Sequence, residues 1–173
     1  MKFYSGFSLK NDEHFFKEYI NSSDYSVCGF SYGATKALKY AKEQLENSKR
    51  VDTLQLFSPI FFQTKSREFK KTQILGFIKD KKSYLEEFVK VAFYPYPKRD
   101  LEHYDASLDE LEELLDYVWD AKELHFLVSK GIKLEVYLGG EDKIIDVVGA
   151  REFFLEVATV TYIKNANHFL QTN

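Results

Sequence analysis

The stretch VCGFSYG, residues 27–33, decides the fold, because a short apolar run passes there into a helical pattern across a serine held between two glycines. Residues 26–29 (SVCG) predict a short strand, and residues 33–46 have the spacing of a helix. Two glycines allow the chain to turn sharply, so that the hydroxyl of Ser31 stands exposed at the carboxyl end of the strand. A G-x-S-x-G pattern in this context indicates a nucleophilic serine.

Strands and helices alternate on both sides of this turn. The patterns predict strands at 2–6, 26–29, 51–57, 132–138 and 158–163, and helices at 12–20, 33–46 and 146–157. Such alternation is typical of βαβ units and a parallel sheet. We therefore expect a single α/β domain over residues 1–173, with a mostly parallel sheet of about five strands.

The stretch from 60 to 128 departs from this alternation. Its pattern predicts two or three helices and then a long helix at 107–130. Residues 61–82 carry seven basic groups against two acids, whereas residues 100–123 carry ten acids against one lysine. Charge runs of this kind are typical of solvated helix faces. We expect residues 60–128 to form a helical, cap-like insertion in the domain.

Composition excludes several classes of function. The net charge of −3 argues against a general nucleic-acid binder, which needs a clustered basic surface. The single cysteine, Cys28, rules out an internal disulfide and a Cys-x-x-Cys metal site, so no metal is expected. No apolar run approaches the roughly 18 residues of a membrane span, and the first residues turn polar too early for a signal peptide. We expect a soluble, cytoplasmic protein without a membrane partner.

A nucleophilic serine needs a histidine base and an orienting carboxylate, here in the chain order serine, acid, histidine. Asp142 lies in the loop GGEDKII after the fourth predicted strand, and His168 lies in KNANHF after the fifth. Because the carboxyl ends of parallel strands share one edge of a sheet, we predict Ser31, Asp142 and His168 as a catalytic triad. Asp146 is an alternative acid, although an N-cap role at the start of the next helix also explains it.

The oxygen that becomes negative during acyl transfer needs two hydrogen-bond donors, which form an oxyanion hole. The first predicted donor is the backbone N–H of Tyr32, because this residue begins a helix whose dipole points its positive end at Ser31. The second is the backbone N–H of Phe7, in the loop after the first strand.

Together these features resemble the α/β-hydrolase family over nearly the whole chain. YSGF at 4–7 stands where many members have a His-Gly-aromatic oxyanion loop. GFSYG matches the nucleophile turn, GEDKII the acid loop, and NHF the usual Gly-His-Phe. Only 24 residues separate Gly6 from Ser31, too few for the extra strand and helix of most members. The resemblance therefore implies a compact α/β-hydrolase fold with a reduced sheet.

Within the family, the chain is similar to the short BioV-type pimeloyl-[acyl-carrier protein] methyl ester esterases of biotin synthesis. The similarity rests on FYSGF near the start, on ATKALKYA after the serine turn, and on LFSP after the third strand. It implies a serine esterase that converts the methyl ester of pimeloyl-acyl-carrier protein to the free carboxylate and methanol. Ser31 would attack the ester, His168 would carry the proton, and Asp142 would hold the imidazole, with no cofactor.

Substrate choice is expected to come from the insertion. Eight aromatic residues could line a slot for the seven-carbon chain, although aromatic residues at such spacing also form plain core. They are Phe61, Phe62, Phe69, Phe77, Tyr84, Phe88, Phe93 and Tyr94, and we choose Phe61, Phe62 and Phe93 as the candidate substrate contacts. Carrier proteins are acidic, so the basic stretch is a candidate docking surface, with Lys65, Arg67, Lys70 and Lys71 as contacts. A competing basic patch on the helix after the serine comprises Lys36, Lys39 and Lys42.

Two other functions share parts of this pattern. A thioesterase or a short-chain esterase would use the same catalytic residues, and its relative rates on carrier-bound and free substrates would distinguish it. A non-catalytic binding protein on the same scaffold usually lacks one member of the triad, whereas this chain keeps all three.

Overall fold

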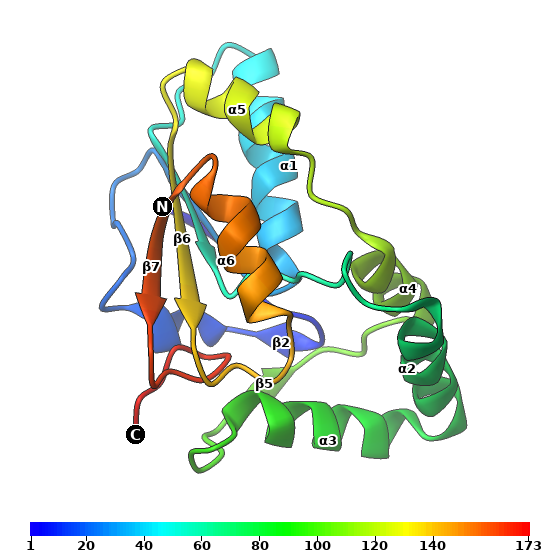
Figure 1. Cartoon of the computed structure of the whole chain (residues 1–173). Coiled ribbons are helices and arrows are strands. Elements are labelled where there is room, and N and C mark those ends of the chain that lie inside the picture. Colours follow the sequence, from blue (N-terminus) through cyan, green and yellow to red (C-terminus); the bar gives the residue numbers. More distant parts are fainter.

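A five-stranded parallel sheet organises the chain (Figure 1). In the computed structural model, which describes residues 1–173, the strands are β1 (Lys2–Tyr4), β3 (Ser26–Phe30), β4 (Thr53–Phe57), β6 (Lys133–Gly139) and β7 (Thr159–Ile163). They lie in the order β1-β3-β4-β6-β7, and every neighbouring pair is parallel. The predicted α/β class and reduced parallel sheet are confirmed.

Successive side chains of a strand face opposite sides of a sheet, and this rule divides the core in two. On one side, Leu56 and Val136 pack in a large cluster with helices α1 (Gly33–Glu46), α5 (Ala121–Ser129) and α6 (Val147–Leu155). On the other side, Phe57 packs in a smaller cluster with Phe16 of the short 3₁₀ helix η1 (Asp12–Phe16). Residues 12–20 were expected to form a helix, of which only this 3₁₀ turn is present.

The insertion lies between β4 and β6. It comprises α2 (Arg67–Lys79), α3 (Lys81–Phe93), the short strand β5 (Glu102–His103) and α4 (Leu108–Asp116), and the chain then enters α5. In Figure 1, α2, α3 and α4 gather on the side of the sheet where β6 and β7 end. The insertion therefore lies over the sheet edge that carries the predicted active site. None of the helices is both long enough and apolar enough to span a membrane.

The long helix predicted at 107–130 is wrong, because the chain breaks it into α4 and α5. Trp119, between them, is only 2% exposed. Its indole N–H donates to the carbonyl oxygen of Ile60 at 2.7 Å, and its backbone N–H donates to Gln63 Oε1 at 2.9 Å. These contacts draw the segment into the core, and Asp120 then caps α5 by accepting from the N–H of Lys122.

A two-stranded antiparallel sheet joins the insertion to the first loop of the chain. Strand β2 (Leu9–Lys10) pairs with β5. Beside this pair, the hydroxyl of Ser8 donates to the carbonyl oxygen of Tyr104 at 2.9 Å. The segment of the insertion between α3 and α4 thus holds the loop after β1, where the second oxyanion donor is predicted.

Candidate active site

Ser31 occupies a strained turn between β3 and α1. Its φ of 53° lies in the left-handed region, which costs a non-glycine residue about 1–3 kcal/mol. The surrounding backbone holds it there, because its N–H donates to the carbonyl oxygen of Phe57 at 2.9 Å and its own carbonyl accepts from Ala34 at 3.1 Å. The side chain therefore projects from the end of the strand.

The two glycines around Ser31 serve close packing. Neither has a positive φ. A Cβ on Gly29 would lie 2.7 Å from the Cα of Ala34, and a Cβ on Gly33 would lie 2.5 Å from the carbonyl oxygen of Ser5. Both distances are shorter than real Cβ atoms allow, so only glycine lets α1 approach β3 and the end of β1 this closely.

The structure brings the three predicted catalytic side chains together. The hydroxyl of Ser31 lies 3.0 Å from His168 Nε2, and His168 Nδ1 lies 2.6 Å from Asp142 Oδ2. The other oxygen of Asp142 accepts from the backbone N–H groups of Ile144 at 2.8 Å and Ile145 at 3.3 Å. Because Asp142 accepts the hydrogen on Nδ1, Nε2 of the neutral ring is free to accept the serine proton.

Asp146, the alternative acid, has a structural role. Its carboxylate accepts from the N–H of Gly149 at 3.1 Å and so caps α6, and it accepts from the hydroxyl of Thr64 at 2.6 Å. The hydrogen bond from Thr64 is the main reason that the pKa of Asp146 is lowered. Asp146 thus contacts Thr64 and the start of α6, whereas Asp142 contacts the histidine.

Asn167 fixes the loop that carries His168, and sequence analysis missed this role. Its side-chain oxygen accepts from the N–H groups of Phe169 and Gln171, both at 3.0 Å. Its amide nitrogen donates to the carbonyl oxygen of Phe93 at 2.8 Å. Asn167 is fully buried, so it ties the histidine loop to the end of α3. A polar residue directly before the histidine was the only signal in the sequence.

The two predicted oxyanion donors have free backbone N–H groups. Neither Phe7 nor Tyr32 donates its N–H to another group in the chain. The neighbouring N–H of Gly6 donates to Asp12 Oδ2 at 2.9 Å, and Asp12 is fully buried. Burial raises the pKa of Asp12 above its ordinary value, against the opposing effect of this hydrogen bond. Asp12 therefore holds the predicted oxyanion loop, and sequence analysis gave no sign of it.

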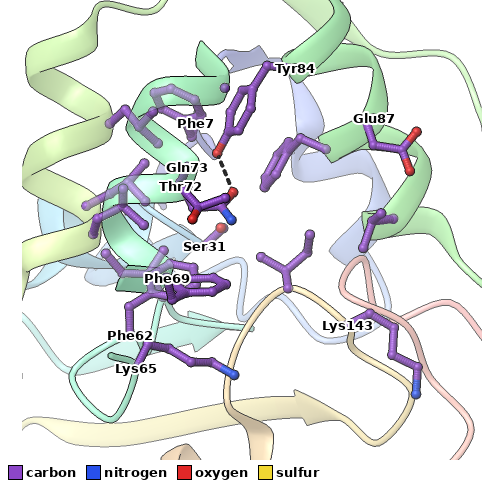
Figure 2. Close-up of a pocket in the computed structure, with 18 residues that line it drawn as sticks. Phe7, Ser31, Phe62, Lys65, Phe69, Thr72, Gln73, Tyr84, Glu87 and Lys143 are labelled. Atoms are coloured by element: carbon purple, nitrogen blue, oxygen red, sulfur yellow. Dashed lines mark hydrogen bonds between the residues drawn. The ribbon is translucent and has the colours of Figure 1, made fainter. Parts of the chain in front are cut away.

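A cavity of about 450 Å³ opens beside Ser31 (Figure 2). Eleven of its 18 lining residues are hydrophobic, so it suits an acyl chain better than a polar substrate. Its apolar walls come largely from the insertion, with Phe69 on α2, Phe88 on α3 and Leu111 on α4. Phe7 also lines the cavity, which places the predicted oxyanion loop at its wall.

Of the three chosen substrate contacts, only Phe62 lines the cavity, whereas Phe69, Tyr84 and Phe88 of the wider aromatic group do line it. Phe61 packs instead against Phe153 of α6, with ring centroids 5.7 Å apart. Phe93 stacks on Phe169 at 4.3 Å, on the other side of the sheet. Both side chains fill the core, because their backbone directs them toward α6 and the histidine loop. The assignment of Phe61 and Phe93 to the slot is therefore wrong.

The basic residues of the insertion differ in their partners. Lys65, Arg67 and Lys71 are exposed, and none makes an ion pair. Lys70 pairs with Asp116 of α4 at 3.2 Å, so much of its charge is matched within the chain.

Two of the three lysines in the competing patch on α1 also form ion pairs within the chain. Lys36 pairs with Glu110 at 3.5 Å, and Lys42 pairs with Glu123. Lys39 is exposed. The acidic run of the insertion thus faces basic side chains of α1 and α2.

No protein-family model matches the chain, and no curated protein matches it. Solved structures do resemble it. Naproxen esterase (carboxylesterase NP) from Bacillus subtilis has a TM-score of 0.53 at 19% identity, with 85% of this chain and 54% of that chain covered. MenH from S. aureus has a TM-score of 0.58 at 13% identity, with 96% of this chain and 85% of that chain covered.

BioG from Haemophilus influenzae has a TM-score of 0.55 at 11% identity, with 97% of this chain and 87% of that chain covered. The chain therefore spans about half the length of the naproxen esterase and most of the length of BioG and MenH. At these identities the likeness shows the fold. The chain has the α/β-hydrolase fold that the sequence predicted.

Proposed function

We propose that this chain is a serine esterase that cleaves carboxylic esters through Ser31. The observation that carries the proposal is the hydrogen-bonded series from Asp142 through His168 to Ser31, beside an apolar cavity. A series of this kind activates a serine hydroxyl, and few other roles require a left-handed serine in contact with a buried histidine. The fold shared with a carboxylesterase supports the same reading.

The reaction follows from the geometry in two steps. Ser31 Oγ bonds to the ester carbonyl carbon while His168 Nε2 takes its proton, and the alcohol then leaves with that proton. A water molecule next gives a proton to His168 and attacks the acyl-serine; His168 then returns that proton to Ser31 Oγ as its bond to the acyl carbon breaks, which releases the carboxylic acid and restores Ser31. The N–H groups of Phe7 and Tyr32 are proposed to hold the negative oxygen in both steps. This chemistry requires no metal or organic cofactor.

For the substrate we propose the methyl ester of pimeloyl-acyl-carrier protein, which yields methanol and the free pimeloyl group during biotin synthesis. The sequence resemblance to BioV-type esterases supports this choice, as does the structural likeness to BioG over nearly both chains. The cavity volume of about 450 Å³ lies within the range of small-ligand sites. Residues 60–128 would act as a cap that encloses the seven-carbon chain.

The acidic carrier protein is proposed to dock on the exposed basic residues Lys65, Arg67 and Lys71. Lys65 also lines the cavity, so it links this surface to the place where the substrate enters. Complementary charge would steer the carrier toward the cavity. Lys70 is expected to contribute less, because Asp116 already pairs with it.

A fluorophosphonate probe, which bonds to activated serines, tests the catalytic proposal. We expect it to label the wild-type chain and to leave the Ser31→Ala variant unlabelled. Rates on the carrier-bound methyl ester, a free short-chain ester and a carrier-bound thioester then test the substrate. Faster cleavage of the thioester would favour a thioesterase, and no labelling of Ser31 would favour a binding protein.

A further inference from the structure

The apolar cavity contains one pair of uncharged polar side chains at a position that the triad does not use. Gln73 on α2 and Tyr84 on α3 both line the cavity, as Ser31 does. The hydroxyl of Tyr84 lies 3.1 Å from Gln73 Oε1, and Figure 2 shows the two side chains pointing toward each other from their helices. The pair is partly buried, whereas the charged lining residues Lys65, Glu87 and Lys143 are exposed.

The packing around Tyr84 fixes the position of its hydroxyl. A Cβ on Gly76 would lie 3.3 Å from Tyr84 Cδ2, so the glycine leaves the space that the ring fills. The ring of Phe77 meets Tyr84 edge-on, with centroids 5.6 Å apart. Glycine inside a helix is less favourable than alanine. Its presence in α2 is explained by the need to seat Tyr84.

The pair leaves a hydrogen-bond donor free. Gln73 Oε1 accepts from Tyr84, and the amide nitrogen of Gln73 has no partner in the chain. If the amide is rotated by half a turn, its nitrogen donates to Tyr84 and the phenol O–H becomes the free donor. The hydroxyl of the adjacent Thr72 is already bound to the carbonyl oxygen of Glu68 at 2.9 Å. In either arrangement, the Gln73–Tyr84 pair can bind an acceptor.

We propose that Gln73 and Tyr84 form a subsite for a second carbonyl group, so that the enzyme selects acyl esters with a carbonyl at the far end of the chain. The inference rests on the proposed esterase function and specifies its substrate class. The ester carbonyl reacts at Ser31, the methylene chain lies against the apolar wall, and the far ester or thioester oxygen accepts from the pair. A simple fatty acyl ester would cover the donor without pairing it, which costs binding energy.

Two esters of the same chain length test whether the enzyme selects a substrate with a second carbonyl group. Dimethyl pimelate carries a second ester carbonyl, whereas methyl heptanoate ends in a methyl group. We expect wild-type kcat/KM per ester group to be about tenfold higher for the diester, because its second carbonyl pairs the donor that methyl heptanoate leaves unpaired. In Gln73→Leu, the ratio of kcat/KM for the diester to that for methyl heptanoate should fall to about one, while methyl heptanoate is still hydrolysed. In Tyr84→Phe the same ratio should fall by a smaller amount.

Thr72→Val is the matched control, because it removes a cavity hydroxyl that is already satisfied within its own helix. It should change kcat/KM for the two esters by the same factor. Equal rates on the two esters in the wild type would overturn the subsite, as would equal losses on both esters in Gln73→Leu with an unchanged melting temperature. Absence of ester hydrolysis altogether would instead defeat the proposed esterase function.

Discussion

The carboxylate of Asp12 accepts the backbone N–H of Gly6 at 2.9 Å, and so fixes the peptide next to the proposed oxyanion donor Phe7. Asp12→Ala leaves that N–H buried without a partner. We expect it to lower the free energy of unfolding by about 1–3 kcal/mol, and to lower kcat more than it raises KM. Urea unfolding and ester kinetics measure the two effects.

Asp12→Asn is the informative partner variant, because its side-chain oxygen can still accept from Gly6. Burial raises the folded-state pKa of Asp12 above its unfolded value, so the folded state binds the proton more tightly. Stability from this group is therefore present below the unfolded pKa and is lost as pH rises through the folded pKa. Asparagine does not ionise, so Asp12→Asn should not lose stability as pH rises. At pH 7 its free energy of unfolding should equal or exceed that of the wild type. Lower stability than Asp12→Ala would contradict this account.

Asn167 joins the histidine loop to α3, and its removal should affect both stability and rate. Asn167→Ala loses three buried hydrogen bonds, so we expect a loss of about 2–4 kcal/mol in unfolding free energy. Asn167→Asp keeps the two acceptor bonds inside the loop but sets a carboxylate against the carbonyl of Phe93. Its kcat should fall with less loss of stability than in the alanine variant. Wild-type kcat in both variants would show that the loop does not position His168.

The glycine that begins α1 is sterically required. Gly33→Ala would place a methyl group 2.5 Å from the carbonyl oxygen of Ser5, and we expect destabilisation of about 3 kcal/mol or more. Gly131→Ala is the matched control, because Gly131 has a φ of 91° but nothing within 4 Å of its Cβ position. The control should cost about 1 kcal/mol. Thermal melting compares the stability of the two variants. A larger fall in melting temperature for Gly131→Ala than for Gly33→Ala would contradict the packing argument.

If the carrier protein docks on the basic residues of the insertion, charge reversal there should slow hydrolysis of the carrier-bound ester but not of a free ester. The double variant Arg67→Glu with Lys71→Glu should lower kcat/KM for the carrier-bound ester about tenfold and leave a free short-chain ester unchanged. Added salt should reduce the wild-type rate on the carrier-bound ester toward that of the variant. Lys39→Glu is the control on α1. A selective loss in that control, with none in the double variant, would move the docking surface to α1.

The sequence predicted the features that depend on chain order, and it could not predict those that depend on packing. Ser31, Asp142 and His168 follow strands β3, β6 and β7 of one parallel sheet, so topology alone brings them to one edge. Phe61 and Phe93 were misassigned because the direction of a side chain in an insertion depends on how its helices pack. The break between α4 and α5 arises from the contact of Trp119 with Ile60, far away in sequence.

The supporting residues were missed for a related reason. Asp12 has the appearance of an ordinary surface acid until its burial is known. Gln73 and Tyr84 become a pair only when α2 and α3 pack side by side. Gly76 of α2 leaves room there for the ring of Tyr84. Such roles belong to three-dimensional contacts, and no local pattern marks them.

Carrier protein bearing the methyl ester of the pimeloyl group, incubated separately with the wild-type chain and with Ser31→Ala, gives a decisive comparison by mass spectrometry. We predict that the wild type removes the mass of one methylene group from the carrier-bound acyl chain and that the variant removes none. An unchanged mass with the wild type, or an equal loss with the variant, would contradict methyl ester hydrolysis through Ser31.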